Sequence, residues 1–222
     1  MNTPSIPGST PADARFGRKI ARRVLVMLAA GSVAALLPAT VASAAGTTAA
    51  CGARSESKVF SPWGDTNNYF AMPNGGFESG TTDWWLSGGA SVVNDNEPWK
   101  VGGSTHGKSL RIPAGAKAES RTICVGIGED KVRLFVKNPK VAGAILHMTV
   151  KARNPQTGAV GETSIDVNAD AWAKGWNPTI QFNIPQLLNG NGQQEMTFFF
   201  ETRGTAATWN IDDVYVDPFR SY

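Results

Sequence analysis

The chain has 222 residues, with 21 basic and 18 acidic side chains and a formal net charge of +3. Five basic side chains but only one acidic side chain lie in residues 1–44, which leaves 16 basic and 17 acidic side chains in residues 45–222, a net charge of −1. This balance argues against a nucleic-acid-binding protein, which concentrates basic residues on one face. The remaining length suits one sizeable domain, and the 24 glycines and 13 prolines indicate many turns between short strands.

The N-terminal segment has the pattern of a secretory signal peptide. Basic residues within 19–23 precede an apolar stretch at 24–37, and the small residues of 42–44 fit a cleavage site after Ala44. We expect residues 1–44 to be removed and the protein to be secreted. The apolar stretch has 14 residues, fewer than the ~20 that span a membrane, so removal is favoured over an uncleaved membrane anchor. The arginine pair leaves the general secretory and twin-arginine export routes both open.

The chain contains two cysteines, Cys51 and Cys124, and both lie in the exported part. An oxidising compartment favours a disulfide between them, whereas two cysteines alone do not make a structural zinc site. We interpret residues 45–58 as a flexible lead-in that Cys51 tethers to an internal strand. A lipoprotein attached through Cys51 and a reactive thiol remain as alternatives.

Residues 59–222 are predicted to form a single all-β domain. Alternation of apolar and polar residues dominates, and no helical period extends over ten residues. The expected strands lie at residues 87–93, 108–112, 116–125, 132–137, 146–151, 160–167, 179–184, 196–201 and 208–216. Turns rich in Gly, Pro and Asn separate them, which predicts an antiparallel β-sandwich whose two sheets each expose their outer face. Jelly-roll topology is favoured over immunoglobulin topology, because the Cys…Trp…Cys arrangement of antibody domains is absent.

Three short motifs resemble extracellular carbohydrate-binding modules. The sequence N-G-G-F-E-S-G at 74–80, followed by Trp84-Trp85, resembles their opening, and G-K-S-L at 107–110 and I-D-D-V at 211–214 resemble an inner and the closing strand. The resemblance extends over about residues 74–217 and implies a jelly-roll sandwich of the galactose-binding-like type. The whole mature chain is also similar to small secreted proteins of high-GC Gram-positive bacteria. The resemblance implies the fold more strongly than the function.

The same resemblance implies a structural calcium site between the first and last strands. The matching residues are Glu78 and either Asp212 or Asp213, and calcium needs few carboxylates when backbone carbonyls complete its shell. Alternation places the two aspartates on opposite faces unless the strand carries a bulge. The alternative is that these acids are exposed at a sheet edge or cap turns. No other cofactor is expected.

All seven tryptophans lie in the exported domain, an unusual excess. An exposed indole can stack on a sugar ring while nearby amides and carboxylates bind its hydroxyl groups. Trp84 and Trp85 are adjacent, so they should point to opposite faces of a strand. The candidate ligand-binding residues, from this strand and two polar loops, are Trp85, Trp99, Trp172, Trp176, Asn96 and Glu97. The alternative is that these tryptophans pack loops onto the core.

The sequence lacks the motifs of common enzymes. It has no G-x-S-x-G elbow, no H-E-x-x-H zinc motif and no phosphate-binding loop. Two carboxylates suffice for a glycosidase, so the acids Asp95, Glu97, Glu129 and Glu201 leave a small glycan-cleaving enzyme as a third interpretation.

We therefore predict a secreted, non-catalytic module that binds a polysaccharide or cell-wall glycan. The alternative of a different class is an extracellular or cell-surface protein-interaction domain. The sequence predicts neither the ligand's identity nor an oligomeric state.

Overall fold

The structure, a computed structural model, describes Cys51 and residues 54–217. The predicted signal peptide at 1–44 and its cleavage site lie outside the described residues. No helix among the described residues is long and apolar enough to cross a membrane. Their helical content is one 3₁₀ turn, η1 (Ser61–Trp63).

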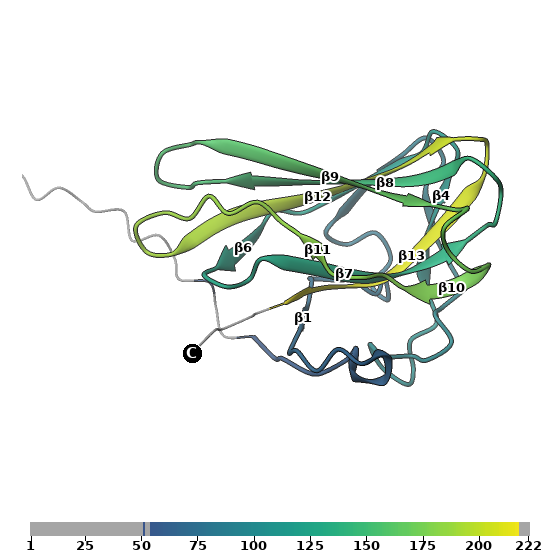
Figure 1. Cartoon of the computed structure of the whole chain (residues 1–222), viewed down its shortest axis with the longest axis horizontal. Coiled ribbons are helices and arrows are strands. Elements are labelled where there is room, and N and C mark those ends of the chain that lie inside the picture. Colours follow the sequence, from purple (N-terminus) through teal and green to yellow (C-terminus); the bar gives the residue numbers. More distant parts are fainter. Residues whose placement is uncertain (1–50, 52–53, 218–222) are drawn as a thin grey trace, which may run out of the picture. The chain divides into compact units, whose positions relative to one another are not determined.

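Two antiparallel sheets pack face to face (Figure 1). The seven-stranded sheet has the order β10-β7-β13-β4-β3, with β1 beside β13 and β11 beside β7. Its strands are β1 (Phe70–Ala71), β3 (Ser91–Val93), β4 (Ser109–Pro113), β7 (Lys131–Asn138), β10 (Gly175–Pro178), β11 (Phe182–Asn183) and β13 (Thr208–Asp217). The six-stranded sheet has the order β2-β5-β12-β8-β9, with β6 beside β12. Its strands are β2 (Trp84–Ser87), β5 (Lys117–Ser120), β6 (Ile123–Gly126), β8 (Ala144–Arg153), β9 (Val160–Asn168) and β12 (Gln193–Gly204).

The connectivity is that of a jelly roll. β4 pairs with β13, β5 with β12, β7 with β10 and β8 with β9, all antiparallel, so the chain folds back on itself as four nested pairs. These pairs are divided between the two sheets. Such nesting of eight strands over two sheets defines the jelly roll. The predicted all-β class and the predicted topology are confirmed.

Alternation explains the core between the sheets. In β8 and β12, buried and partly exposed residues alternate, and the inward side chains include Met148, Val150, Phe198 and Phe200. Burial of such side chains stabilises each by roughly 1.5–3 kcal/mol. The outward positions of the same strands are therefore free to carry polar or functional side chains.

Several strand boundaries differ from the prediction. The strand expected at 87–93 is divided between β2 and β3, because Gly88 and Gly89 adopt positive φ angles of 63° and 90° and turn the chain from one sheet to the other. The strand expected at 116–125 is divided into β5 and β6, and that expected at 179–184 is reduced to β11. β10 forms where a loop was expected.

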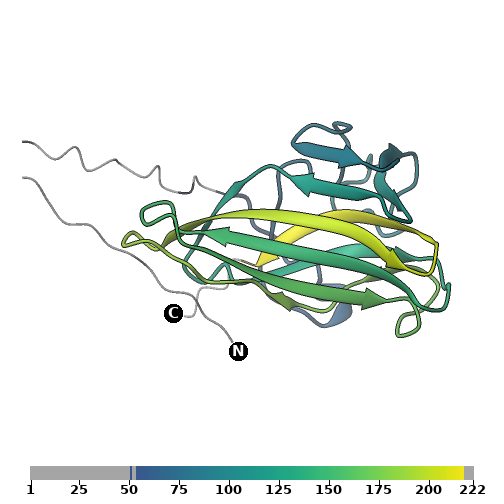
Figure 2. The same ribbon diagram turned by 90° about the horizontal axis from the view of Figure 1, so that it is seen from above.

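The expectation that both sheets expose their outer faces is wrong for the seven-stranded sheet. The segment around η1 covers this sheet (Figure 1), and Phe60 stacks on Phe135 of β7 with ring centroids 5.4 Å apart. Tyr69 and Tyr215 complete this second buried cluster. The six-stranded sheet carries no covering segment in the described part of the chain (Figure 2), so its outer face is open.

The predicted disulfide between Cys51 and Cys124 is confirmed. It leaves no free cysteine, which removes the basis for a lipid-linked or reactive thiol. Beside it, the guanidinium of Arg54 lies 3.9 Å from the centre of the Phe70 ring and forms an ion pair with Glu129. The described end of the lead-in is thus attached to the sandwich.

Candidate functional site

Five outward side chains line up across the open face of the six-stranded sheet. Trp85 of β2 lies opposite Glu119 of β5, Glu119 opposite Phe199 of β12, Phe199 opposite Thr149 of β8, and Thr149 opposite Ser164 of β9. Residues in register across a sheet point to the same side. We call these five residues the central row. Two aromatic rings and three polar groups therefore share one line that runs across the strands.

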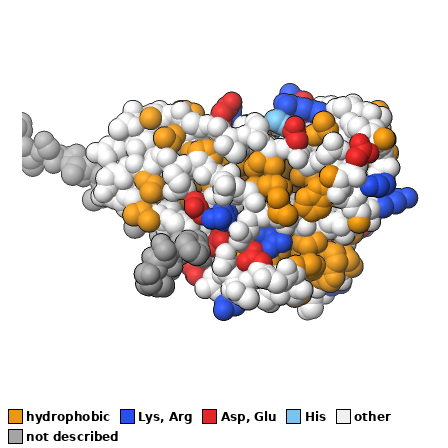
Figure 3. All heavy atoms as spheres, viewed as in Figure 1, with side chains coloured by type: hydrophobic (Ala, Val, Ile, Leu, Met, Phe, Trp, Pro, Cys, Tyr) orange, Lys and Arg blue, Asp and Glu red, His pale blue; other side chains and the backbone are white. Residues whose placement is uncertain are grey.

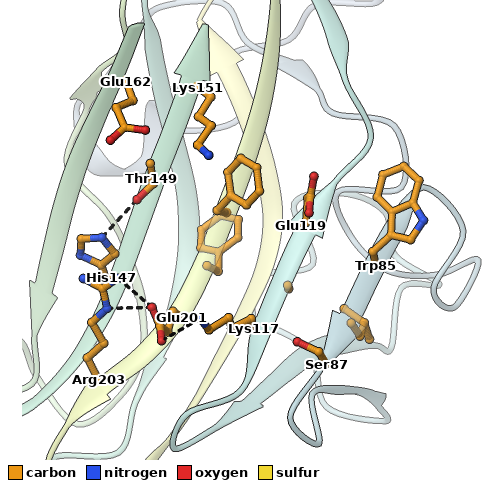
Figure 4. A pocket seen from close by; sticks show the side chains of 14 residues that line it. Trp85, Ser87, Lys117, Glu119, His147, Thr149, Lys151, Glu162, Glu201 and Arg203 are labelled. Atoms are coloured by element: carbon orange, nitrogen blue, oxygen red, sulfur yellow. Dashed lines mark hydrogen bonds and ion pairs between the residues drawn. The ribbon is translucent and has the colours of Figure 1, made fainter. Parts of the chain in front are cut away.

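A groove of about 490 Å³ lies over this row and is lined by four of its members, all except Ser164. Side chains from β2, β5, β12, β8 and β9 line it (Figure 4), and every lining residue belongs to a strand rather than a loop. The tryptophan at its edge, Trp85, is 63% exposed, whereas its neighbour Trp84 is buried against Phe77 and Phe200. The expected opposite orientation of the two adjacent tryptophans is therefore present.

The second ring of the row, Phe199, is half-buried, and the Lys151 ammonium lies 4.7 Å from the ring centre. One strand, β5, separates it from Trp85. Two strand spacings correspond to about 10 Å between the attachment points of the rings. An extended ligand can therefore contact both rings at once only if it runs across the strands.

Glu201 forms ion pairs with two cations on one flank of the groove. Its carboxylate accepts from Arg203 at 2.7 Å and lies 3.5 Å from the Lys117 ammonium (Figure 4). Burial raises the pKa of Glu201, but the hydrogen bond and charge of Arg203, with Lys117, outweigh it and hold the pKa below its usual value. Two cations and one carboxylate therefore leave this flank with a net charge of +1.

His147, also in the groove, is hydrogen-bonded through both ring nitrogens. Its Nδ1 lies 2.5 Å from an Asp166 oxygen and its Nε2 lies 3.1 Å from the Thr149 hydroxyl. The Thr149 hydroxyl is in turn 3.0 Å from that of Ser164. These four side chains form one continuous hydrogen-bonded chain, of which His147 and Thr149 line the groove.

The structure does not bring the six predicted ligand-binding residues together. Trp85 lies in the groove, but Trp99 lies on the other side of the sandwich and is 46% exposed. The centre of its ring is 5.0 Å from that of Trp63 and 5.6 Å from that of Phe135. Figure 3 is viewed as Figure 1, and exposed hydrophobic side chains gather in the half of the view in which Figure 1 labels β10. Trp176 lies on this strand.

The other two tryptophans of the set are half-buried. Trp176 packs against the second cluster, and Trp172 packs against the main core, where its carbonyl accepts from Asn138 at 2.9 Å. Both therefore match the alternative in which tryptophans pack loops onto the core.

Glu97 and Asn96 organise their own loop. Glu97 is fully buried, and its carboxylate accepts the backbone N–H groups of Trp99 and Val101, both at 2.6 Å. The Asn96 side chain donates to the Glu97 carbonyl at 2.7 Å. Their polar groups are thus used to hold the loop that carries Trp99.

A bulge places both closing aspartates inside. The β13 register shifts between Asp212 and Tyr215, and Asp213 adopts a φ of 47°, so neither aspartate is more than 4% exposed. Burial and the charge of Asp213 raise the pKa of Asp212 to about 9, and burial and the charge of Glu97 raise that of Asp213 to about 6. Burial and mutual repulsion therefore favour the protonated form of both carboxyl groups.

The residues considered for calcium each have backbone partners. Glu78 accepts from the N–H groups of Gly107 at 2.8 Å and Lys108 at 2.9 Å, and Asp213 accepts from that of Gly102 at 3.0 Å. Among the described residues, no three His, Cys, Asp or Glu side chains are grouped as a metal site. Calcium therefore stays a prediction from the resemblance.

The four acids considered for glycosidase chemistry do not form a pair. Asp95 binds Lys137 at 2.7 Å, Glu129 binds Arg54, and Glu97 is enclosed in its loop. Glu201 alone of the four lies in the groove, where Arg203 and Lys117 hold it ionised.

No protein-family model and no curated protein matches this chain. Solved structures with a similar fold include a family 61 carbohydrate-binding module in complex with β-1,4-galactotriose, at 16% identity and a TM-score of 0.41 over 68% of this chain and 98% of that chain. A family 28 module specific for non-crystalline cellulose has 15% identity and a TM-score of 0.45 over 66% and 94%. An arabinose-bound α-L-arabinofuranosidase has 14% identity and a TM-score of 0.44 over 66% and 26%. At such values the similarity says nothing about what this chain binds.

Proposed function

We propose that this chain is a secreted, non-catalytic module that binds a glycan across the open face of its six-stranded sheet. The observation that carries this proposal is the central row, in which an exposed Trp85 and a half-exposed Phe199 lie in one line and form part of the groove's lining. The disulfide supports secretion, because such bonds persist in oxidising compartments.

The proposed binding mode follows from the geometry of the row. Sugar rings present an apolar face to the indole of Trp85 and to Phe199, while their hydroxyl groups reach the polar side chains between and beyond the rings. The glycan runs perpendicular to the strands, since only this direction passes over both rings.

One of the three glutamates that line the groove supports a non-catalytic role. A glycosidase needs two carboxyl groups that flank the bond, one of them held protonated. Arg203 and Lys117 hold the pKa of Glu201 below its usual value, so this acid is poorly suited to donate a proton.

The test is a titration of tryptophan fluorescence with cello-, xylo-, galacto- and arabino-oligosaccharides, followed by affinity electrophoresis on the corresponding polysaccharides. We expect saturable binding to at least one glycan, and Trp85→Ala should weaken it by about tenfold or more through lost stacking. Trp99→Ala, on the other side of the sandwich, is the matched control and should leave affinity unchanged. Thermal denaturation checks that both variants are folded.

The opposite result is equally clear. If no glycan in the panel binds the folded protein, or if Trp99→Ala abolishes binding and Trp85→Ala does not, the proposed site is wrong. The first result would favour the protein-interaction alternative, and the second would move the glycan to the Trp63–Trp99 surface.

A further inference from the structure

The polar groups of the central row offer acceptors to a ligand, and Glu119 is the first of them. It lies in register between Trp85 and Phe199, and its exposed side chain lines the groove. Within the described part of the chain, no hydrogen bond or ion pair engages its carboxylate. An ionised carboxylate accepts hydrogen bonds and donates none. A ligand that spans the two rings therefore meets a free acceptor between them.

His147 sets the direction of the two hydroxyl groups that follow. Asp166 accepts at Nδ1, so a neutral imidazole carries its proton there and its Nε2 must accept. Thr149 then donates its only proton to His147, and Ser164 donates its own to Thr149. Both hydroxyl groups keep only lone pairs for a ligand. All three polar groups of the row therefore present acceptors to a ligand.

The cations beside the row contact groups other than Glu119. Lys117 and Arg203 lie beside the Glu201 carboxylate, and the Lys151 ammonium lies over the Phe199 ring. None of them forms an ion pair with Glu119 within the described residues. The carboxylate between the two rings therefore keeps its charge without a direct cationic partner.

Resting on the function proposed above, we propose that the groove selects an uncharged glycan with free hydroxyl groups and rejects glycans that carry carboxylate or sulfate groups. A neutral glycan donates its O–H protons to Glu119 and Thr149 in the groove, and to Ser164 where it extends past the groove's edge. An anionic group would face a carboxylate and two sets of lone pairs, and would leave its own acceptors unpaired. Glu119 is then a specificity-determining residue, and His147 a positioning residue that acts through Thr149.

The test compares neutral ligands with acidic counterparts on the mature chain: cello-oligosaccharides with their carboxymethylated forms, xylan with glucuronoxylan oligosaccharides, and galactan with oligogalacturonate. We expect the acidic member of the bound pair to bind at least about tenfold more weakly. Glu119→Gln keeps the shape of the side chain but adds a hydrogen-bond donor. It should lower the affinity for the neutral ligand by about fivefold and narrow the difference in affinity between the neutral and the acidic ligand. Glu56→Gln, at an exposed glutamate outside the groove, is the matched control and should change neither affinity.

A double-variant comparison tests His147 separately. Its Nε2 is the acceptor for the Thr149 proton. His147→Phe removes this acceptor, which frees the Thr149 proton and gives the row a donor. Discrimination against the acidic ligand should therefore narrow in His147→Phe. In the background of Thr149→Val, which has no such proton, His147→Phe should cause no further change in discrimination.

The outcomes distinguish this inference from the proposed function. If acidic and neutral ligands bind equally and Trp85→Ala abolishes both, the groove binds glycans but the inference is overturned. It is also overturned if Glu119→Gln behaves like Glu56→Gln. If Trp85→Ala changes no affinity, or no ligand binds, the proposed function fails and the inference with it.

Discussion

The buried Arg133 of β7 joins the N-terminal segment to the seven-stranded sheet. It donates to the Thr179 carbonyl at 2.8 Å and to the Asp65 carboxylate at 2.5 Å, which also accepts from the Tyr69 hydroxyl at 2.5 Å. Burial raises the pKa of Asp65, but the hydrogen bonds from Tyr69 and Arg133 outweigh it and hold the pKa below its usual value. The folded protein therefore stabilises the ionised form of Asp65, which pairs with Arg133.

Asp65→Asn is expected to lower the free energy of unfolding by about 3 kcal/mol at pH 7, because it leaves the buried charge of Arg133 without its partner. The folded pKa of Asp65 lies below the unfolded value of 3.8, so the stabilisation is present above pH 3.8 and is lost as the pH falls through the folded pKa. Urea denaturation from pH 7 to pH 2 should show the difference between the two proteins shrinking with acid. A constant difference across this range would contradict the assignment. Asp83→Asn, which breaks the more exposed pair with Arg121, should cost less than about 1 kcal/mol.

At the scale of elements, alternation predicted the inward side chains of β8 and β12 correctly, because their sheet has one open face. It failed for β7, where Arg133 and Phe135 occupy the expected exposed face and are buried. The segment that covers them, residues 57–69, comes from far away in the sequence. Its packing depends on tertiary contacts that no local pattern reports.

The same reason explains which residues of the candidate groove the sequence predicted. The exposure of Trp85 was predicted because adjacent tryptophans in a strand must point to opposite faces. Glu119, Thr149 and Ser164 were missed, since their common line depends on the register of five strands. Phe199 alone carried a signal, as an aromatic residue at a position that alternation assigned to the polar face.

The loop between β3 and β4 packs against the β13 bulge, and Gly102 is the contact that allows it. A Cβ atom there would lie 2.4 Å from Asp213 Oδ1 and 2.6 Å from His106 Nδ1. Gly102→Ala should therefore push the loop away and lower the free energy of unfolding by about 1–3 kcal/mol. Gly107→Ala is the control in the same loop, because a Cβ atom at that position would meet nothing within 4 Å. Thermal denaturation of both variants is the measurement, and equal losses would show that Gly102 has no special contact.

At the scale of the whole molecule, the two outer faces of the sandwich have different roles. The seven-stranded face is covered by the segment around Phe60 and Tyr69, which follows a lead-in attached through the disulfide. The six-stranded face is open and carries the groove. Cys124 lies on β6 opposite Glu195, four positions along β12 from Phe199. The strand that carries Cys124 and the central row therefore share β12 as a neighbour.

This arrangement predicts that the disulfide stabilises the fold but does not contribute to affinity at the proposed binding groove. Its cysteines are 73 positions apart, so the loop-closure model assigns it about 4 kcal/mol. The double variant Cys51→Ser/Cys124→Ser should therefore lower Tm by about 10 °C. Below that Tm, its affinity for the bound glycan should stay within about twofold of the parent, because the register of β2, β5, β12, β8 and β9 does not depend on the lead-in. Calorimetry and fluorescence titration measure the two quantities on the same samples. Loss of binding in a variant that remains folded would mean that the covered face controls the shape of the open one.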